Sequence, residues 1–108
     1  MGRVRRMFCA KKLITPEQSI ANGALLTENS SILAVGGISG FRREQEIEVF
    51  DFPNAYITPG FIDTHIHGAG GFDCSKAAES VKPFSAMCAI LGSRGVTGFF
   101  PTVVADER

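Results

Sequence analysis

The sequence predicts an α/β protein in which a strand-rich N-terminal part precedes a single strand–helix–strand unit. Two observations support this prediction. Between residues 3 and 58, short apolar or alternating runs are separated by turn residues, and no helical period stands out. Between residues 61 and 104, the pattern becomes strand, loop, helix and strand. The two strands of this unit should be parallel, because a helix connects them.

The N-terminal strands are recognised by their alternation and by the breaks between them. The run from Glu46 to Asp51 alternates charged and apolar residues, which is typical of a half-buried strand. Breaks are expected at Lys11-Lys12, Asn22-Gly23, Glu28 to Ser31 and Pro53-Asn54. The strands expected between these breaks cover residues 4–10, 24–26, 32–35, 46–51 and 55–57. Together they predict a β-meander, with residues 38–45 as a polar loop.

One amphipathic helix is predicted after residue 80. Pro83 suits a first helical turn, and Gly95 suits the left-handed position beyond the last turn. The apolar face has the spacing i, i+3, i+4 and i+7 and comprises Phe84, Met87, Cys88 and Leu91. The following run from Val96 to Phe100, closed by Pro101, is expected to be a buried strand.

The residues that could carry chemistry gather around the only two histidines, His65 and His67. If residues 61–67 form a strand, Asp63, His65 and His67 project from one face. Two imidazoles at this spacing can bind one cation, with bonds of ~2.0–2.1 Å. The glycines of the run 68–71 allow a sharp turn directly after the pair. The sequence therefore predicts two ligands of a metal site that needs further ligands.

Composition limits the possible partners and the compartment. The 108 residues contain 11 basic and 11 acidic side chains, so no overall charge favours nucleic acid or a membrane surface. Three cysteines, an odd number without Cys-x-x-Cys spacing, argue against a disulfide framework and suit a reducing, cytoplasmic compartment. Neither a signal peptide nor a membrane-spanning run is seen. Cys74 is interpreted as a small buried hydrophobe rather than a ligand. Asp73 is interpreted as a turn or helix cap.

The length of the chain suggests that these elements do not complete a domain. Parallel sheets are normally covered on both faces and contain more than two strands. A meander with one strand–helix–strand unit leaves two parallel strands without neighbours on their outer sides. We therefore expect the sequence to be the first part of a larger fold.

The motif from Pro59 to His67 resembles the amidohydrolase superfamily. Its continuation, Gly68-Ala69-Gly70-Gly71-Phe72-Asp73, and the later block from Gly95 to Thr102 resemble the N-acetylglucosamine-6-phosphate deacetylase family within it. The resemblance implies that residues 1–57 form part of a small β-sandwich and that residues 58–108 begin a (β/α)8 barrel. It also implies a homodimeric parent protein, while composition alone indicates a cytoplasmic protein with neither nucleic acid nor membrane as a partner.

The resemblance further implies a metal-dependent hydrolysis of the N-acetyl group of N-acetylglucosamine 6-phosphate. His65 and His67 would be ligands of a divalent cation, zinc or iron. Asp63 could orient an imidazole, or could instead bond to the backbone at the base of the strand. No catalytic residue can be assigned within the 108 residues, because the family's catalytic aspartate and remaining ligands lie on later strands.

Two other interpretations remain open at this point. The chain could belong to another amidohydrolase branch, such as a cyclic amidase or a deaminase. The glycines after the histidines disfavour dihydroorotase-like members, which tend to place an arginine there. Alternatively, it could be a non-enzymatic β-rich module that kept the motif. If the chain is instead the N-terminal part of a deacetylase, the isolated chain is expected to bind metal weakly and to show no turnover. Two histidines fall short of the usual three ligands of catalytic zinc.

Overall fold

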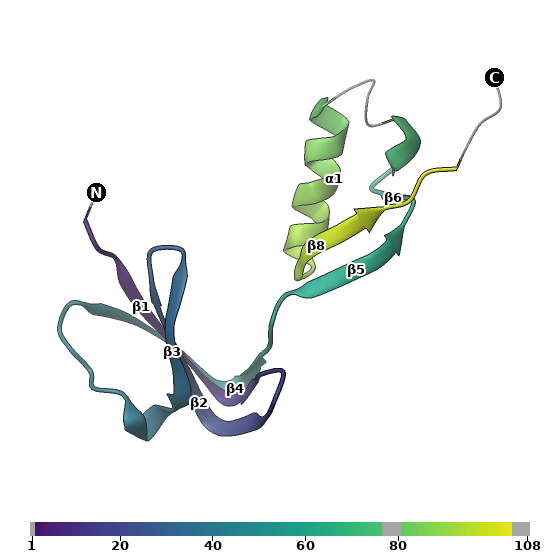
Figure 1. The fold of residues 1–108 in the computed structure, drawn as a ribbon. Helices are drawn as coiled ribbons and strands as arrows, with labels where there is room; N and C mark the ends of the chain where they lie inside the picture. Colours follow the sequence, from purple (N-terminus) through teal and green to yellow (C-terminus); the bar gives the residue numbers. More distant parts are fainter. Residues whose placement is uncertain (1, 77–80, 105–108) are drawn as a thin grey trace. The chain divides into compact units, whose positions relative to one another are not determined.

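The computed structural model describes residues 2–76 and 81–104, which form two compact units divided between Pro59 and Gly60 (Figure 1). The first unit consists of strands and one short 3₁₀ turn, and the second contains a single α-helix among its described residues. The predicted α/β class, with strands first and a strand–helix–strand unit afterwards, is confirmed.

The first unit is a four-stranded sheet with the order β3-β2-β1-β4. Its strands are β1 (Arg5–Ile14), β2 (Ser19–Glu28), β3 (Ser31–Gly37) and β4 (Ile47–Ile57). The first three form the predicted antiparallel meander. The prediction is wrong for β4, which pairs in parallel with β1 at the opposite edge. The connection between β3 and β4, which includes a 3₁₀ turn at Ile38–Gly40, is long enough to cross to that edge.

Three of the predicted breaks lie inside strands. Lys11-Lys12 lies within β1, Asn22-Gly23 within β2 and Pro53-Asn54 within β4. Asn22 has a φ of 45°, and the β1–β4 register shifts between Ala10 and Lys12. A side chain on Gly23 would overlap the side chain of Leu13 across the sheet. These residues therefore accommodate irregular strands and close backbone approach instead of ending the strands.

The turn predicted between Glu28 and Ser31 is confirmed. Asn29 has a φ of 53°, a left-handed conformation that asparagine tolerates. Its side-chain Oδ1 accepts from the backbone N–H of Val4 at 3.1 Å, while its own N–H donates to the Val4 carbonyl at 2.8 Å. The turn between β2 and β3 is thereby fixed to the start of the chain.

One buried cluster of the first unit lies on a single face of the sheet. Met7, Cys9, Ala24 and Ile47 are buried there, with Leu26, Ile38 and Phe41 packed against them. Burial raises the pKa of the Cys9 thiol, as expected for a cysteine that serves as a core side chain. On the other face, the rings of Phe8 and Phe50 stack at a centroid distance of 5.1 Å.

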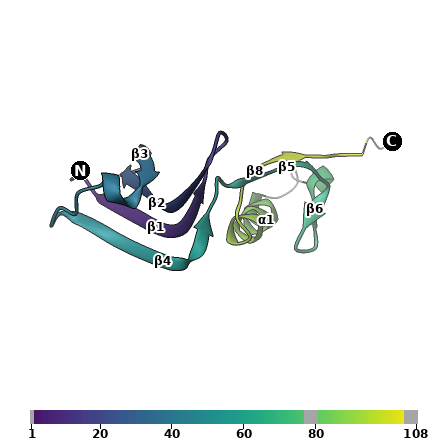
Figure 2. The same ribbon diagram turned by 90° about the horizontal axis from the view of Figure 1, so that it is seen from below.

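The second unit is the predicted strand–helix–strand unit (Figures 1 and 2). Strand β5 (Phe61–Ile66) pairs in parallel with β8 (Val96–Pro101), and helix α1 (Val81–Ser93) connects them. On the predicted apolar face, Met87 and Leu91 are buried, while Phe84 and Cys88 are half-buried. Gly95 has a φ of 85°, and its N–H donates to the Gly92 carbonyl, as expected beyond a helix end.

The core of this unit lies between helix α1 and one face of the two-stranded sheet. Phe99 of β8 packs against this core, whereas its neighbour Phe100 is 62% exposed. The strand predicted over residues 96–100 is confirmed, but the prediction that it is buried is wrong: Thr97 and Phe100 are exposed, and the other three residues are half-buried. Among the described residues, only the helix-facing side of β8 is covered by an apolar cluster.

The glycine run after the histidines forms a tight hairpin. Two short strands, β6 (Gly68–Ala69) and β7 (Phe72–Asp73), pair in antiparallel fashion around Gly70-Gly71. The φ angles of Gly70 and Gly71 are 63° and 80°, which fit a type I′ turn. A side chain on Gly68 would overlap the backbone carbonyl of Phe72. A 3₁₀ turn at Cys74–Lys76 follows directly.

Replacing Gly68 by alanine is expected to disrupt the hairpin and to destabilise the second unit by about 1–3 kcal/mol, since backbone atoms must move to admit the methyl group. Gly92→Ala is the matched control, because Gly92 lies in helix α1 with no atom near the added methyl group. It is expected to stabilise the unit by about 0.4–1 kcal/mol. Urea unfolding of both variants measures the difference, and equal stabilities would contradict the expectation.

Candidate metal site at the end of strand β5

The backbone around the histidine pair is held by two hydrogen bonds and by the packing of one side chain. The carbonyl of Ile66 accepts from the Thr102 N–H at 2.7 Å, and the carbonyl of His67 accepts from the Cys74 N–H at 2.7 Å. The Ile66 side chain packs against the buried cluster beneath helix α1. Ile66 is half-buried and is the last residue of β5, so that His65 before it projects from the opposite side of the strand. His67 lies just beyond the strand, where its carbonyl is held by Cys74. The core of the unit therefore orients the pair.

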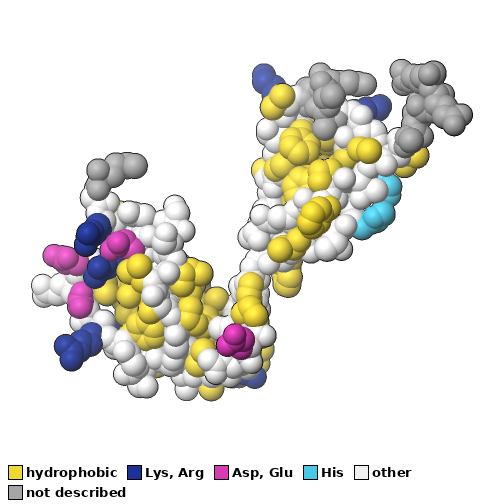
Figure 3. Space-filling view, viewed as in Figure 1, with side chains coloured by type: hydrophobic (Ala, Val, Ile, Leu, Met, Phe, Trp, Pro, Cys, Tyr) yellow, Lys and Arg dark blue, Asp and Glu magenta, His cyan; other side chains and the backbone are white. Residues whose placement is uncertain are grey.

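The two imidazole rings lie next to each other in the structure. Their centroids are 4.9 Å apart and the ring planes meet at 84°. Both side chains are exposed, and they form one patch on the surface of the second unit (Figure 3). The hydroxyl Oγ1 of Thr102 lies 3.4 Å from Nδ1 of His65. Within residues 2–76 and 81–104, no group of three or more histidine, cysteine or acidic side chains is arranged to hold a metal ion.

The carboxylate of Asp63 contacts the backbone of the pair. Its Oδ1 accepts from the N–H of His65 at 3.1 Å, while the Asp63 side chain is half-buried. This is the backbone bond that the sequence left open as an alternative to imidazole orientation. It fixes the peptide unit that carries His65, so that Asp63 acts on the pair through the main chain.

Cys74 and Asp73 have the structural roles that the sequence favours for them. Cys74 is buried, with its Sγ 3.7 Å from the Ile66 carbonyl and 4.0 Å from the sulfur of Met87. Oδ1 of Asp73 accepts from the Ser75 N–H at 2.9 Å, at the start of the 3₁₀ turn. Hydrogen bonds from the backbone and side chain of Ser75 lower the pKa of Asp73.

The lowered pKa of Asp73 predicts a pH dependence of the hairpin. Because the folded state favours the carboxylate, the stabilisation is present above the ordinary pKa of 3.8 and is lost as the pH falls through the lower, folded value. An NMR titration of the Asp73 carboxyl carbon is expected to show a midpoint below 3.8. Ser75→Ala keeps the backbone N–H and should move the midpoint partly back. A midpoint that is the same in both proteins would contradict the role of the Ser75 hydroxyl.

Thr102 is the contact of the pair that sequence reasoning missed. It follows β8 directly, and its N–H and hydroxyl reach Ile66 and His65 respectively. The carboxyl ends of neighbouring parallel strands meet at one edge of a sheet. The predicted strand–helix–strand unit could therefore have placed the residues after Pro101 beside the histidines, although not the contact itself.

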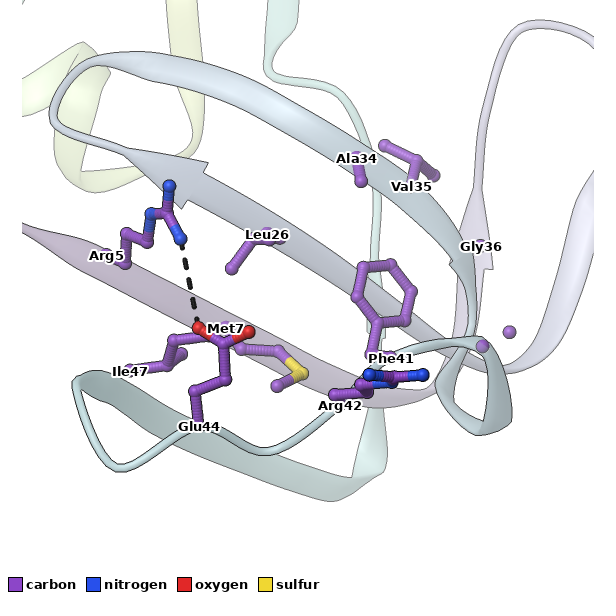
Figure 4. Close-up of a pocket in the computed structure, with 12 residues that line it drawn as sticks. Arg5, Met7, Leu26, Ala34, Val35, Gly36, Phe41, Arg42, Glu44 and Ile47 are labelled. Carbon is purple, nitrogen blue, oxygen red and sulfur yellow. Dashed lines mark ion pairs between the residues drawn. The ribbon is translucent and has the colours of Figure 1, made fainter.

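The first unit contains two concave regions of different character. One, of about 520 Å³, lies over the core face and is lined by Arg5, Met7, Leu26 and Phe41 among others (Figure 4). Its Arg5 pairs with Glu28 at 2.9 Å and approaches Glu44 at 3.9 Å. The other, of about 290 Å³, is lined almost entirely by apolar groups such as Leu13, Ile57 and Pro59. Neither contains a histidine or a cysteine.

Comparison with known proteins relates this geometry to a family. No protein-family model matches the chain. Over 51 residues, 46% of the chain, it is 51% identical to N-acetylglucosamine-6-phosphate deacetylase of Mus musculus. Over 103 residues, 94% of the chain, it is 32% identical to the deacetylase of the same name from Homo sapiens. The chain is therefore similar to the N-terminal part of N-acetylglucosamine-6-phosphate deacetylases.

The structural comparison agrees with this similarity. The N-acetyl-D-glucosamine-6-phosphate deacetylase of Mycobacterium smegmatis, solved as a mutant in complex with N-acetyl-D-glucosamine-6-phosphate, matches 94% of the chain with a TM-score of 0.78 and 25% identity. The chain spans 12% of the mouse relative, 23% of the human relative and 25% of the M. smegmatis protein. Separately, no helix in the described part of the chain has the length and apolarity needed to cross a membrane.

Proposed function

We propose that the chain is the N-terminal portion of a metal-dependent hydrolase that removes the N-acetyl group from N-acetylglucosamine 6-phosphate. The observation that carries the proposal is the pair His65 and His67, fixed side by side at the end of β5 in a chain related to deacetylases over 103 residues. In this role the chain contributes ligands and the first strand–helix–strand unit. No catalytic residue is assigned within the chain; His65 and His67 are assigned as metal ligands only.

The two histidines suit a divalent cation in spacing and chemistry. Two imidazoles that bind one ion at ~2.0–2.1 Å, roughly tetrahedrally, have ring centroids about 5 Å apart. The observed centroid distance of 4.9 Å is compatible with this arrangement. Imidazole is a preferred ligand of zinc and iron. When bound, such a cation would supply Lewis-acid activation of the amide and of water.

The chain's own residues hold and orient the ligands in this proposal. Asp63 fixes the peptide unit of His65, and the N–H of Cys74 fixes the carbonyl of His67. The hairpin from Gly68 to Asp73 begins directly after the pair. The Asp63 carboxylate thus positions a ligand through the main chain.

The proposal extends to the domains of the whole protein. Residues 1–57 would form part of a small β-sandwich, and residues 58–108 would begin a (β/α)8 barrel that this chain leaves incomplete. The exposed Phe61 and Phe100, both 62% exposed, support this extension, because parallel sheets are normally covered on both faces. The whole protein would be a cytoplasmic homodimer acting on a small-molecule amino-sugar phosphate.

Complementation tests the proposal. The chain alone is expected to show no hydrolysis of N-acetylglucosamine 6-phosphate, because two histidines leave the metal at least one protein ligand short of the usual three. Mixing it with the human deacetylase lacking its matching 103 residues is expected to restore acetate release in the presence of zinc. Turnover by the chain alone would contradict the proposal. So would an inactive mixture in which the two polypeptides co-elute as a folded complex.

A further inference from the structure

The hydroxyl of Thr102 sits between the imidazole of His65 and a backbone carbonyl. Its Oγ1 lies 3.4 Å from Nδ1 of His65 and 3.5 Å from the carbonyl oxygen of Phe100. The Thr102 residue is half-buried, and its N–H donates to the Ile66 carbonyl at 2.7 Å. The backbone hydrogen bond therefore fixes the position of Thr102, and its hydroxyl contacts the imidazole of His65.

The single hydrogen of the Thr102 hydroxyl determines which atom donates and which accepts in each of these two contacts. A threonine hydroxyl has one hydrogen to donate and lone pairs to accept with. The Phe100 carbonyl can only accept, whereas the Nδ1 of a neutral histidine can either donate or accept. Both contacts are satisfied together only if the hydroxyl donates to Phe100 and accepts from Nδ1–H of His65. In that arrangement the lone pair of His65 is on Nε2.

We infer that Thr102 is a positioning residue that fixes His65 as the Nδ1–H tautomer and leaves Nε2 to bind the cation. This inference rests on the proposed metal-binding role of the pair. A hydrogen bond from one ring nitrogen sets which nitrogen is free for a metal, and such partners hold the ring in the geometry that the ion needs. Both distances are long for hydrogen bonds, so the contribution of Thr102 is orientation more than stability.

The tautomer of His65 can be measured directly in the metal-free chain. Long-range ¹H–¹⁵N correlation spectra distinguish a protonated ring nitrogen from an unprotonated one. The spectra are recorded in mildly alkaline buffer, in which a free imidazole is neutral. His65 is expected to show a protonated Nδ1. His67 is the internal control, because Thr102 approaches only His65. A protonated Nε2 on His65 would overturn the inference.

Two substitutions separate the hydroxyl from the shape of the side chain. Thr102→Val keeps the branched shape but removes the hydroxyl, and it should allow His65 to populate both tautomers. Thr102→Ser keeps the hydroxyl and should retain the single tautomer. By isothermal titration with zinc, Thr102→Val is expected to weaken the Kd by roughly 10-fold or more, with Thr102→Ser close to the unsubstituted chain. Equal tautomers and equal Kd values in Val and Ser variants would overturn the inference.

The tautomer and the zinc Kd distinguish a failure of the inference about Thr102 from a failure of the proposed function. If the chain shows the Nδ1–H tautomer and Thr102→Val abolishes it, the positioning by Thr102 stands even where zinc does not bind to the histidines. In that case the proposed function is what has failed. If zinc binds through both histidines but the tautomer and the Kd are indifferent to Thr102→Val, the proposed function stands and the inference about Thr102 is overturned. The spectrum of the unsubstituted chain decides the point even if a variant does not fold.

Discussion

Replacing both His65 and His67 by alanine is expected to abolish saturable zinc binding by the chain. The unsubstituted chain is expected to bind zinc weakly through the two imidazoles, and to lose it during gel filtration, because catalytic zinc normally has three protein ligands. Each single substitution should weaken the Kd by at least 10-fold, since one imidazole remains with water as its partner. Isothermal titration at low protein concentration measures the three variants against the parent chain.

A rival explanation is that a cysteine near the pair binds the metal. Cobalt(II) distinguishes the two, because thiolate ligands give an intense charge-transfer absorption that imidazoles do not. We expect this band to be absent, since Cys74 is only 4% exposed and its Sγ contacts a carbonyl and the sulfur of Met87. Cys74→Ala, provided that it folds, should retain weak zinc binding. A thiolate band, or binding that survives loss of both histidines, would contradict the assignment of the ligands.

The parts of the fold that could be predicted are those set by short-range patterns. The helix face through Met87 and Leu91, the left-handed Gly95 and the parallel pairing of β5 with β8 all follow from residues within one strand–helix–strand unit. Helical and strand periods are local, and a helical connection favours parallel strands. The proximity of the two histidines could be predicted for the same reason, because they are only two residues apart. Regular alternation from Asp63 to His67 could not, since β5 ends at Ile66 and its pairing with β8 shifts between Asp63 and Ile66.

Strand pairing between residues far apart in the sequence accounts for the wrong predictions of strand breaks and of the partner of β1. Asn22-Gly23 has the composition of a hairpin turn, but nine residue pairs between β1 and β2 hold it in a strand. The local turn preference is weaker than this ladder, and Gly23 is needed where Leu13 crosses closely. The parallel partner of β1 depends on where the chain goes after residue 40, which no local pattern determines. The contact of Thr102 with His65 likewise depends on the register between β5 and β8.

The second large effect is expected from the core that supports the pair. Met87 is 1% exposed and packs with Cys74 and Leu91, in the cluster that also contacts Ile66. Met87→Ala is expected to destabilise the second unit by about 2–5 kcal/mol, because it removes buried apolar contacts and leaves a cavity. Met87→Leu, which nearly conserves volume, should cost less than about 1.5 kcal/mol. Amide hydrogen exchange in β5 and β8 measures the loss of stability of the second unit separately from that of the first.

Met7→Ala is the matched control, because Met7 is also 1% exposed but belongs to the cluster of the first unit. It is expected to lower protection in β1 and β2, while Met87→Ala lowers it in β5 and β8. Since Ile66 separates the two histidines and rests on the Met87 cluster, Met87→Ala should also weaken zinc binding with both histidines present. Met7→Ala should leave zinc binding unchanged. If both variants lost protection throughout the chain, or if zinc binding were indifferent to Met87→Ala, the packing beneath Ile66 would not be what orients the pair.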